Sequence, residues 1–357
     1  MQSPNEIIIA AAGGGKTTRI VKRALADGTV RSALLSYTQN NVLEIEKAIS
    51  CLNASVPPHV EVWSWFSFLL REMARPYQRA LHDRRVDGIH WVEGRSDRFA
   101  RQADISRFYF SDGRLIYSDK LSRFICECNK ASAGAVIKRL EQRFDHIYID
   151  EIQDMAGYDI DLIELIMRSQ IGVTLVGDHR QSTYRTNNAA KNRTYAGIHI
   201  IDKFREWHKS NLGMLSYEQE SFRCQQSIVD LADAFFPDEP RTVSRNDAVT
   251  GHDGVFAIQS GSVNDYVKRY QPQILRLNKS ALCEGYEAMN YGESKGLTFN
   301  RVMIFPHKQA KQWLSSGDFK HVAGSAAKMY VGITRARYSV AFVFDGNLGV
   351  AGVKKYE

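Results

Sequence analysis

The sequence has little of what an extracellular or membrane-bound protein needs. Its five cysteines are scattered over 357 residues, and only Cys126 and Cys128 are closely spaced. Neither a disulfide framework nor a zinc site at the usual spacing is indicated, so we expect reduced thiols. No apolar run approaches the length that spans a bilayer, and Pro4, Asn5 and Glu6 precede the first apolar run, which is not typical of a signal peptide. We therefore expect a cytoplasmic protein without a membrane partner.

The composition is otherwise that of an ordinary globular protein, with 44% hydrophobic and 24% charged residues. A chain of this length can bury a large core, and we expect it to form two domains. The net charge of +7 favours an anionic partner such as nucleic acid, although many basic proteins bind none.

A glycine-rich segment follows the first predicted strand, which is the apolar run at residues 7–12. Glycine N–H groups and the N-terminus of the following helix can hold phosphates, with Lys16 on the outer phosphates and the Thr17 hydroxyl on Mg²⁺. The predicted nucleotide-binding residues are Ala12, Gly13, Gly14, Gly15, Lys16, Thr17 and Thr18. The general pattern begins with a glycine where this chain has Ala10, and a plain glycine-rich turn with a surface lysine is the alternative.

Strands and helices alternate along the chain. The first half has predicted strands at 32–36, 60–63, 146–149 and 173–176, and predicted helices at 16–26, 64–75, 121–141 and 160–167, with a further helix capped by Asn40 and Asn41. This alternation is typical of a doubly wound parallel sheet. The second half has predicted strands at 255–258, 302–305 and 340–344, and predicted helices at 225–236 and 330–337. We expect an α/β fold with a first domain at residues 1–212, including a small, mostly helical insertion at about 72–135, and a second domain at residues 213–357.

The insertion is rich in arginine. Between Arg71 and Arg107 there are nine arginines, Arg98 among them, and six acidic residues, Asp97 among them, but no lysine. Together with nearby aromatic residues such as Trp91, these arginines could hold phosphates and bases. A solvated helical face with internal ion pairs is the alternative, and we favour it slightly for any single arginine.

Two acidic residues end the predicted strand at 146–149. Open α/β sheets bind their ligands at the carboxyl ends of the strands. Hydrolysis of a phosphoanhydride needs held phosphates, a metal, an activated water and neutralisation of charge. We therefore predict that Asp150 and Thr17 hold Mg²⁺, with Asp150 acting through water, and that Glu151 orients or deprotonates the attacking water. Without the glycine-rich segment, a turn or helix cap would explain these acids equally well.

Seven motifs in this sequence together resemble those of superfamily 1 helicases of the UvrD/Rep type. In order along the chain they are Ala10–Thr17 (motif I), Ser36–Asn40 (motif Ia), Asp150–Asp154 (motif II), Gly177–Tyr184 (motif III), Ser221–Arg223 (motif IV), Ser294–Phe299 (motif V) and Tyr330–Ala336 (motif VI). The resemblance implies two RecA-like P-loop domains with parallel sheets, ATP and Mg²⁺ as cofactors, and single-stranded or tailed DNA as the partner.

The resemblance also implies roles for individual residues. Gln181 would sense the γ-phosphate, and Arg223 and Arg335 would act as arginine fingers from the second domain. Phe222 takes the place of the aromatic residue that stacks on adenine. The positions that fall where family members contact single-stranded DNA are Tyr37, Thr38, Ser64, Trp65, Tyr184, Arg185 and Lys295. Among the aromatic residues at 63–68, we expect Trp65 alone to contact a base, because some of them must face the core.

The chain departs from the family pattern at several motif positions. Motif III usually continues with an aromatic residue and an arginine that touch DNA, but here Thr186 and Asn187 follow. In motif V, Gly292 and Thr298 stand where a histidine and a glutamate are usual. Base stacking and sugar recognition are therefore open at these points.

Two larger parts of the family pattern are also missing from the sequence. The chain between Arg223 and Lys295 is too short for the large accessory domain, and the upstream glutamine-bearing segment that reads adenine is absent. Phe222 is therefore the main candidate for holding the base, and a preference for ATP over other nucleotides stays open.

The function that these motifs imply is that of a compact, ATP-dependent 3′→5′ single-stranded DNA translocase or helicase with DNA-stimulated ATPase activity. The main alternative is an ATP-gated, DNA-sensing subunit that activates a partner nuclease, or another protein partner, with little unwinding of its own. Action on RNA is a further alternative, and a P-loop kinase is remote.

Overall fold

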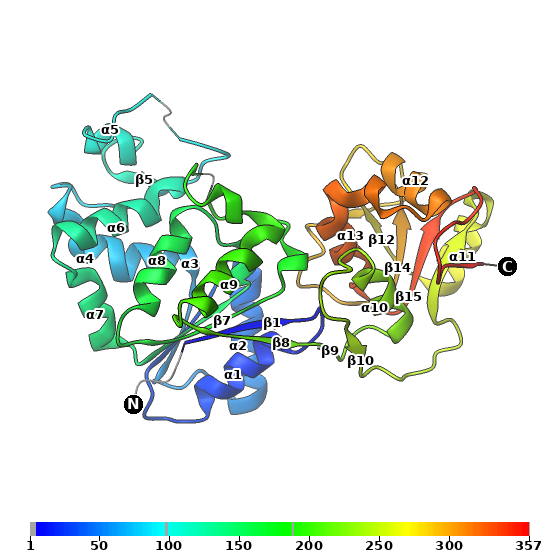
Figure 1. Ribbon diagram of the computed structural model, residues 1–357, viewed down its shortest axis with the longest axis horizontal. Coiled ribbons are helices and arrows are strands. Elements are labelled where there is room, and N and C mark those ends of the chain that lie inside the picture. The colour runs from blue at the N-terminus through cyan, green and yellow to red at the C-terminus, as the bar shows by residue number, and fades with distance from the viewer. Residues whose placement is uncertain (1–4, 97–98, 188, 357) are drawn as a thin grey trace. The chain divides into compact units, whose positions relative to one another are not determined.

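The computed structural model describes residues 5–96, 99–187 and 189–356, so Pro4, Asp97 and Arg98 lie outside the described residues. The chain divides into two compact units, drawn as a ribbon in Figure 1. Unit 1 comprises the chain up to Ile9 together with Lys16–His179 and Tyr184–Ser216. Unit 2 comprises Ala10–Gly15, Arg180–Thr183 and the chain from Tyr217 onward. Among the described residues, no helix is both long enough and apolar enough to cross a lipid bilayer.

Unit 1 is built on a six-stranded sheet. Its strands, in sheet order, are β3 (Val60–Ser64), β2 (Ser32–Ser36), β6 (His146–Asp150), β7 (Gly172–Gly177), β1 (Glu6–Ala10) and β8 (Met214–Glu218). The pairs from β3 to β1 are parallel, with Ser36 opposite Ser64 and Asp150 opposite Val176. The carboxyl ends of these strands therefore meet at one edge, as the alternation in the sequence predicts.

Helices cover both faces of this sheet. The helices of unit 1 outside the short α5 of the insertion are α1 (Lys16–Leu25), α2 (Gln39–Asn53), α3 (Trp65–Phe68), α4 (Arg75–Tyr77), α6 (Leu121–Ala131), α7 (Ala135–Arg143), α8 (Tyr158–Met167) and α9 (Ile200–Lys209). In Figure 1, α1 and α2 lie on one side of β1 and β7, and α8 and α9 lie on the other. This division follows from right-handed crossovers, because the strand order runs in one direction from β1 to β3 and in the opposite direction from β3 to β8.

Four local predictions differ from the structure. The helix expected at 330–337 spans Ala326–Ile333, and Ala336 already belongs to the strand that follows. The single helix expected at 121–141 is two helices, because Ala133 and Gly134 have φ angles of 51° and 86° and break it between α6 and α7. The cap of α2 is Thr38, whose hydroxyl accepts from the Asn41 N–H, so Asn40 and Asn41 lie inside the first turn. The helix expected at 64–75 begins after Ser64 as α3 and continues as a π-helix at Leu69–Ala74 and then as α4.

The insertion contains more than helices. Strands β4 (Gly88–His90) and β5 (Leu115–Tyr117) pair in parallel, and the short helix α5 (Ile105–Tyr109) lies between them in sequence. Short 3₁₀ helices occur in unit 1 at Gln78–Ala80, Ser118–Lys120, Ile152–Asp154, Arg193–Tyr195 and Gly197–His199.

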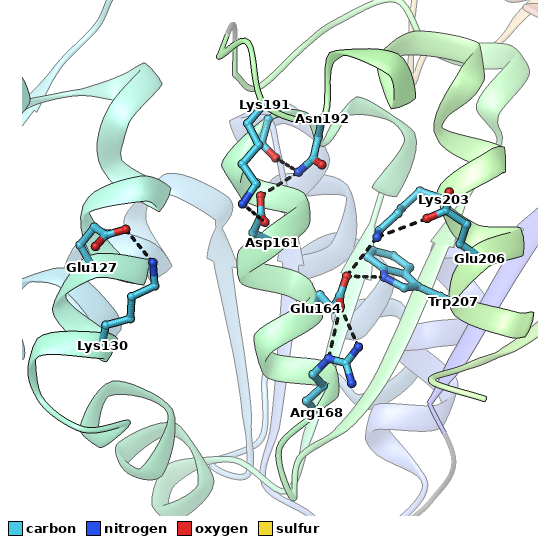
Figure 2. A network of polar contacts seen from close by, with 11 residues as sticks. Glu127, Lys130, Asp161, Glu164, Arg168, Lys191, Asn192, Lys203, Glu206 and Trp207 are labelled. Carbon is cyan, nitrogen blue, oxygen red and sulfur yellow. Dashed lines mark hydrogen bonds and ion pairs between the residues drawn. The ribbon is translucent and has the colours of Figure 1, made fainter. Parts of the chain in front are cut away.

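Helix α8 holds the chain that follows strand β7, as Figure 2 shows for Lys191, Asn192, Lys203 and Trp207. Asp161 accepts from Asn192 at 2.7 Å and pairs with Lys191 at 2.6 Å. One turn further, Glu164 accepts from the Trp207 indole at 2.9 Å and pairs with Arg168 and Lys203. These donors lower the pKa of Glu164 to about 2, although burial, the largest single influence, opposes them. The chain that follows motif III, here residues 189–209, is therefore held against α8 at Asp161 and at Glu164.

Unit 2 is built on a second six-stranded sheet. Its strands, in sheet order, are β13 (Met289–Asn290), β12 (Gln273–Arg276), β14 (Phe299–Phe305), β15 (Ala336–Val343), β11 (Gly254–Ile258) and β16 (Lys354–Lys355), all paired in parallel. Its other elements are β9 (Glu220–Ser221), α10 (Gln226–Asp233), β10 (Val243–Ser244), α11 (Val263–Tyr270), α12 (Lys308–Ser316) and α13 (Ala326–Ile333).

Both faces of the second sheet are buried, because successive side chains point to opposite sides. Val302 and Ile304 pack with α10, α12 and α13, whereas Met303 and Phe305 pack with α11. A six-stranded sheet with helices in each unit confirms the predicted α/β class and agrees with the expected pair of RecA-like domains.

Candidate nucleotide and nucleic-acid sites

The carboxyl edge of the first sheet brings together a hydroxyl and two carboxylates. Thr17, near the start of α1, donates its hydroxyl hydrogen to Asp150 Oδ2 at 2.7 Å. Asp150 is 2% exposed at the end of β6, and its other oxygen accepts from the Glu151 N–H at 2.9 Å. Burial, with the charge of Glu151 as the next cause, raises the pKa of Asp150 to about 6. The Asp150 carboxylate is therefore costly to ionise in isolation, as expected for a group that receives positive charge.

Glu151 has a strained backbone and a fixed side chain. Its φ and ψ are 57° and 39°, which is the left-handed region that a residue with a side chain seldom occupies. Gln153, 1% exposed, donates a short hydrogen bond to Glu151 Oε2 and accepts from the Asp178 N–H at 3.1 Å. Gln153 thereby connects the end of β6 with the end of β7. The sequence placed it inside motif II without indicating this positioning contact.

The same edge provides oxygen ligands of the kind that Mg²⁺ prefers. Mg²⁺ in nucleotide sites is held by one or two carboxylates together with phosphates and waters, and the Thr17 hydroxyl and Asp150 carboxylate fit that description. No cluster of three or more His, Cys, Asp or Glu side chains suited to a metal occurs in the part of the chain that the structure describes. A site completed by phosphates does not need such a cluster.

In unit 2, the glycine-rich backbone packs tightly on the motif IV segment. The Phe222 N–H donates to Gly13 O at 3.0 Å, and Ser221 Oγ donates to Ala12 O at 2.7 Å. Gly13 has φ of +76°, and a Cβ there would lie 2.4 Å from the Cβ of Arg223. Only glycine fits this position, since both the conformation and the space exclude a side chain. The Phe222 ring is 62% exposed, so it is available to stack on a base.

Unit 2 also joins two of the predicted catalytic residues. Arg335, 1% exposed just after α13, donates from Nη2 to Gln181 Oε1 at 3.0 Å. Its Nε and Nη1 are held by the carbonyls of Val331 and Leu297. Arg223 donates from Nη1 to Thr334 O at 3.3 Å, next to Arg335 in sequence. The two predicted arginine fingers and the predicted γ-phosphate sensor are therefore organised within one unit.

The predicted DNA contacts are unevenly accessible. Tyr184 and Arg185 are exposed, whereas Tyr37 is half-buried and tilted against Phe66 at 6.0 Å between centroids. Burial raises the pKa of the Tyr37 hydroxyl. Two predicted contacts, Thr38 and Ser64, cap α2 and α3, and in unit 2 Lys295 is half-buried in a turn where its N–H donates to Gly292 O. A role in DNA binding therefore stays a prediction for these six residues.

Trp65 requires a correction, because its ring is fully buried and cannot contact a base in this conformation. Its indole N–H donates to Asp159 Oδ1 at 3.1 Å. The turn from Ser64 at the end of β3 into α3 directs this side chain towards α8. Trp63, by contrast, is half-buried beside the guanidinium of Arg71, 5.6 Å from its ring centroid.

The acceptor of Trp65, Asp159, is the centre of a buried polar network. Asp159 accepts from Trp65 and Ser122 on one oxygen and from the Thr186 hydroxyl on the other. Burial raises its pKa, and these hydrogen bonds oppose that effect. The Thr186 oxygen also accepts from the Ala156 N–H at 3.0 Å. One carboxylate thus connects α3, α6, α8 and the chain after motif III, which the sequence analysis missed.

This network explains the departures at motif III. Thr186 and Asn187 are both buried, and Asn187 Oδ1 accepts from the Ala189 N–H at 2.8 Å. The backbone N–H of Thr186 donates to Asp154 O at 3.0 Å, in the segment that carries Glu151. Thr186 and Asn187 therefore form hydrogen bonds that hold the loop in place. They stand where the family pattern usually has an aromatic residue and an arginine that touch DNA.

Part of the chain matches a family model. Residues 68–199 match the UvrD/REP helicase N-terminal domain. The ATP-dependent DNA helicase PcrA of Leuconostoc citreum is 27% identical over 103 residues, which are 29% of this chain and 13% of that protein. A probable DNA helicase II homolog of Mycoplasma genitalium is 27% identical over 132 residues, 36% of this chain and 18% of that protein. The matched region is therefore less than a fifth of either relative.

Solved helicase structures are more distant. The PRRSV helicase has a TM-score of 0.47 at 14% identity and covers 95% of this chain and 52% of its own. The helicase nonstructural protein 10 of an arterivirus, in complex with DNA, has a TM-score of 0.47 at 14% identity, with 95% and 60% covered.

Proposed function

We propose that the chain is an ATP-dependent 3′→5′ single-stranded DNA translocase or helicase of the UvrD/Rep type, and its partial matches to that family support the proposal. The observation that carries the proposal is the Thr17–Asp150 hydrogen bond beside Glu151 at the carboxyl edge of the first sheet. A hydroxyl and a buried carboxylate next to a positioned second carboxylate are what a nucleotide hydrolase requires.

Each residue of the site then has a defined task. The backbone of Ala12–Gly15 and Lys16 hold the phosphates of ATP, and Thr17 and Asp150 hold Mg²⁺, which supplies positive charge next to the phosphates. Glu151 orients or deprotonates the attacking water, with Gln153 fixing its carboxylate. The positive φ angles of Gly13 and Gly15 support this assignment, since a phosphate-binding turn needs glycines in this conformation.

The unit 2 residues complete the proposal. Arg335 and Arg223 neutralise charge that develops on the transferred phosphoryl group, and Gln181 reports its presence. Their mutual contacts favour a joint role, because Arg335 and Gln181 are hydrogen-bonded and Arg223 is tied to Thr334. Phe222, exposed beside the glycine-rich backbone, is proposed to stack on the base.

The central test is ATP turnover with and without single-stranded DNA. We expect stimulation by DNA and a loss of about 10²-fold or more in Glu151→Gln, as for removal of a general base. Glu287→Gln, an exposed position in unit 2, is the matched control and should retain activity. Undiminished turnover in Glu151→Gln would overturn the catalytic assignment. Strand displacement on 3′- and 5′-tailed duplexes tests the direction, and matched DNA and RNA strands test the preferred nucleic acid.

A second candidate function is favoured by the buried positions of Thr186 and Asn187. Because these residues hold the loop and do not reach outward, we propose as the alternative an ATP-gated, DNA-sensing subunit that activates a nuclease partner with little unwinding of its own. Strong DNA-stimulated ATPase without strand displacement in the isolated chain, and displacement or cleavage only with a partner, would favour this alternative. Efficient displacement by the isolated chain would exclude it.

A further inference from the structure

Two adjoining cavities of unit 1 are lined by cations. The first has a volume of about 360 Å³, and its charged lining residues are Arg95, Arg185 and Arg193, with no acidic residue among the described ones. The second has a volume of about 320 Å³ and shares Arg95 and Ala189 with the first. We call the two together the basic groove. Volumes of this size lie at the lower end of those of ligand sites.

The second cavity adds aromatic rings to the cations. Its charged residues besides Arg95 are Lys120, Arg123, Lys191 and Asp119, and its rings are Phe108 and Tyr158. The groove as a whole therefore has six cationic side chains and one carboxylate in its lining. Although Lys191 pairs with Asp161, five further cationic side chains line the groove against one carboxylate, and a concave surface focuses their positive potential.

One wall of the groove is the segment after motif III, and it is held without any ligand. The Asn192 amide donates to Gly157 O at 2.8 Å and to Asp161 at 2.7 Å, and Lys191 pairs with Asp161 at 2.6 Å (Figure 2). The wall therefore starts from an ordered conformation, which reduces the entropy cost of binding.

The opposite wall comes from the insertion and is equally fixed. Asp119 accepts from the Ser96 N–H at 3.0 Å and from its hydroxyl at 2.7 Å, so the one carboxylate of the groove is already engaged. Lys120 donates to Phe108 O at 2.6 Å, with its ammonium 4.0 Å from the Phe108 ring centroid. The insertion thus places aromatic faces next to positive charge.

Arg123 connects the two walls. Its guanidinium lies 4.8 Å from the Phe108 centroid and 5.1 Å from that of Tyr158 on α8. Its Nε–H is buried without a hydrogen-bond partner among the described residues. Arg185 and Arg193 are exposed, and neither pairs with an acidic residue that the structure describes. Cations beside aromatic faces suit a strand that carries both phosphates and bases.

We propose that the basic groove is a second binding site for single-stranded nucleic acid, which extends the predicted path from Arg185 into the insertion. This inference rests on the proposed function. A strand fits better than an acidic peptide, because Arg185 belongs both to the groove and to the predicted DNA path, and because aromatic faces line the groove. The groove contributes phosphate contacts that are independent of base sequence.

The test is the binding of a length series of labelled oligodeoxythymidylates at several salt concentrations. Loss of one phosphate contact should weaken the binding of the longer strands about fivefold at about 0.1 M salt and reduce the salt slope by about 0.7. We expect this result for Arg193→Gln and for Arg123→Gln, and little change for Arg193→Lys, which keeps the charge. Arg79→Gln, an exposed arginine of the insertion outside the groove lining, is the control.

Two results would overturn the groove as a strand site. One is an unchanged affinity and salt slope in both glutamine variants at every strand length. The other is a loss of binding to polyglutamate without a loss of binding to DNA, which would assign the groove to an acidic protein segment. The ATPase activity of the wild type, measured with the same strands, separates the two proposals. If DNA stimulates the ATPase but both glutamine variants bind the strands like the wild type, only the groove is refuted. If DNA does not stimulate the ATPase, the proposed function is refuted.

Discussion

Replacement of Thr186 by valine tests the buried network around Asp159. The change keeps the shape of the side chain but removes its hydroxyl, so Asp159 loses one of its three side-chain donors and the Ala156 N–H loses its acceptor. Each unsatisfied buried polar group costs about 1–3 kcal/mol, and the added methyl group returns about 0.8 kcal/mol. With two such groups, we expect the free energy of unfolding to fall by about 1–5 kcal/mol.

Urea unfolding of Thr186→Val, followed by circular dichroism, measures this loss as a shift in midpoint at constant slope. The matched control is Thr194→Val, at an exposed position of unit 1, which should stay within about 0.5 kcal/mol of the wild type. Equal stability of the two variants would refute the reasoning, because it would mean that the Thr186 hydroxyl carries no net hydrogen-bond energy in the folded chain.

Asp159→Asn separates the charge from the hydrogen bonds. The amide oxygen can still accept from Trp65 and Ser122, and its NH₂ can donate to the Thr186 oxygen, so the loss should be smaller than in Thr186→Val. Because burial raises the pKa of Asp159, the folded state holds its proton at pH values where the unfolded state has released it. Stability from this group therefore falls as pH rises through that window, and the variant should lack this dependence.

Gly13→Ala should destabilise the chain more than Gly15→Ala, since both glycines have positive φ but only at Gly13 would a Cβ come within 2.4 Å of another atom; thermal unfolding measures the difference. Gln153→Ala should lower kcat for ATP with little change in KM, because it releases the carboxylate of Glu151 without touching the phosphate-binding backbone, and an unaltered kcat would contradict this. Glu164→Gln should flatten the acid limb of stability: the donors that hold the pKa of Glu164 at about 2 stabilise the fold above its unfolded pKa of about 4.3, and this contribution is lost as pH falls towards 2. Melting temperatures that fall equally in the variant and the wild type between these pH values would contradict the last expectation.

The sequence predicted the candidate nucleotide site best where that site is formed by residues adjacent in sequence. The glycine-rich segment and the acids at 150–151 each follow a buried strand, and parallel pairing is sufficient to bring strand ends to one edge. The Thr17–Asp150 contact therefore follows from two local patterns and one topological rule. Eight of the twelve strands in the two described sheets were predicted from short apolar runs bounded by polar residues, whereas β8, β12, β13 and β16 were not predicted.

Features that depend on distant segments could not be predicted in this way. Trp65 has the same local sequence whether its ring faces a base or Asp159, and only the packing of α3 against α8 decides between them. The break at Gly134 requires a φ of 86° that the apolar pattern of the neighbouring helices does not report. Helix α9 is different, because the spacing of Ile200, Phe204 and Trp207 already indicates a helix with one buried face, and this local signal was missed.

The positions of Thr186 and Asn187 alter how the chain would grip a strand. With these two side chains turned inward, the exposed side chains of this segment include Tyr184, Arg185, Lys191 and Arg193. Three of these four are cationic, so under the proposed function phosphate contacts would outnumber stacking contacts at this point of the path. Stacking energy changes little with salt, whereas each phosphate contact releases counterions on binding. A strand held in this way should show affinity that depends steeply on ionic strength and weakly on base identity, and the inward-facing Thr186 is the structural cause.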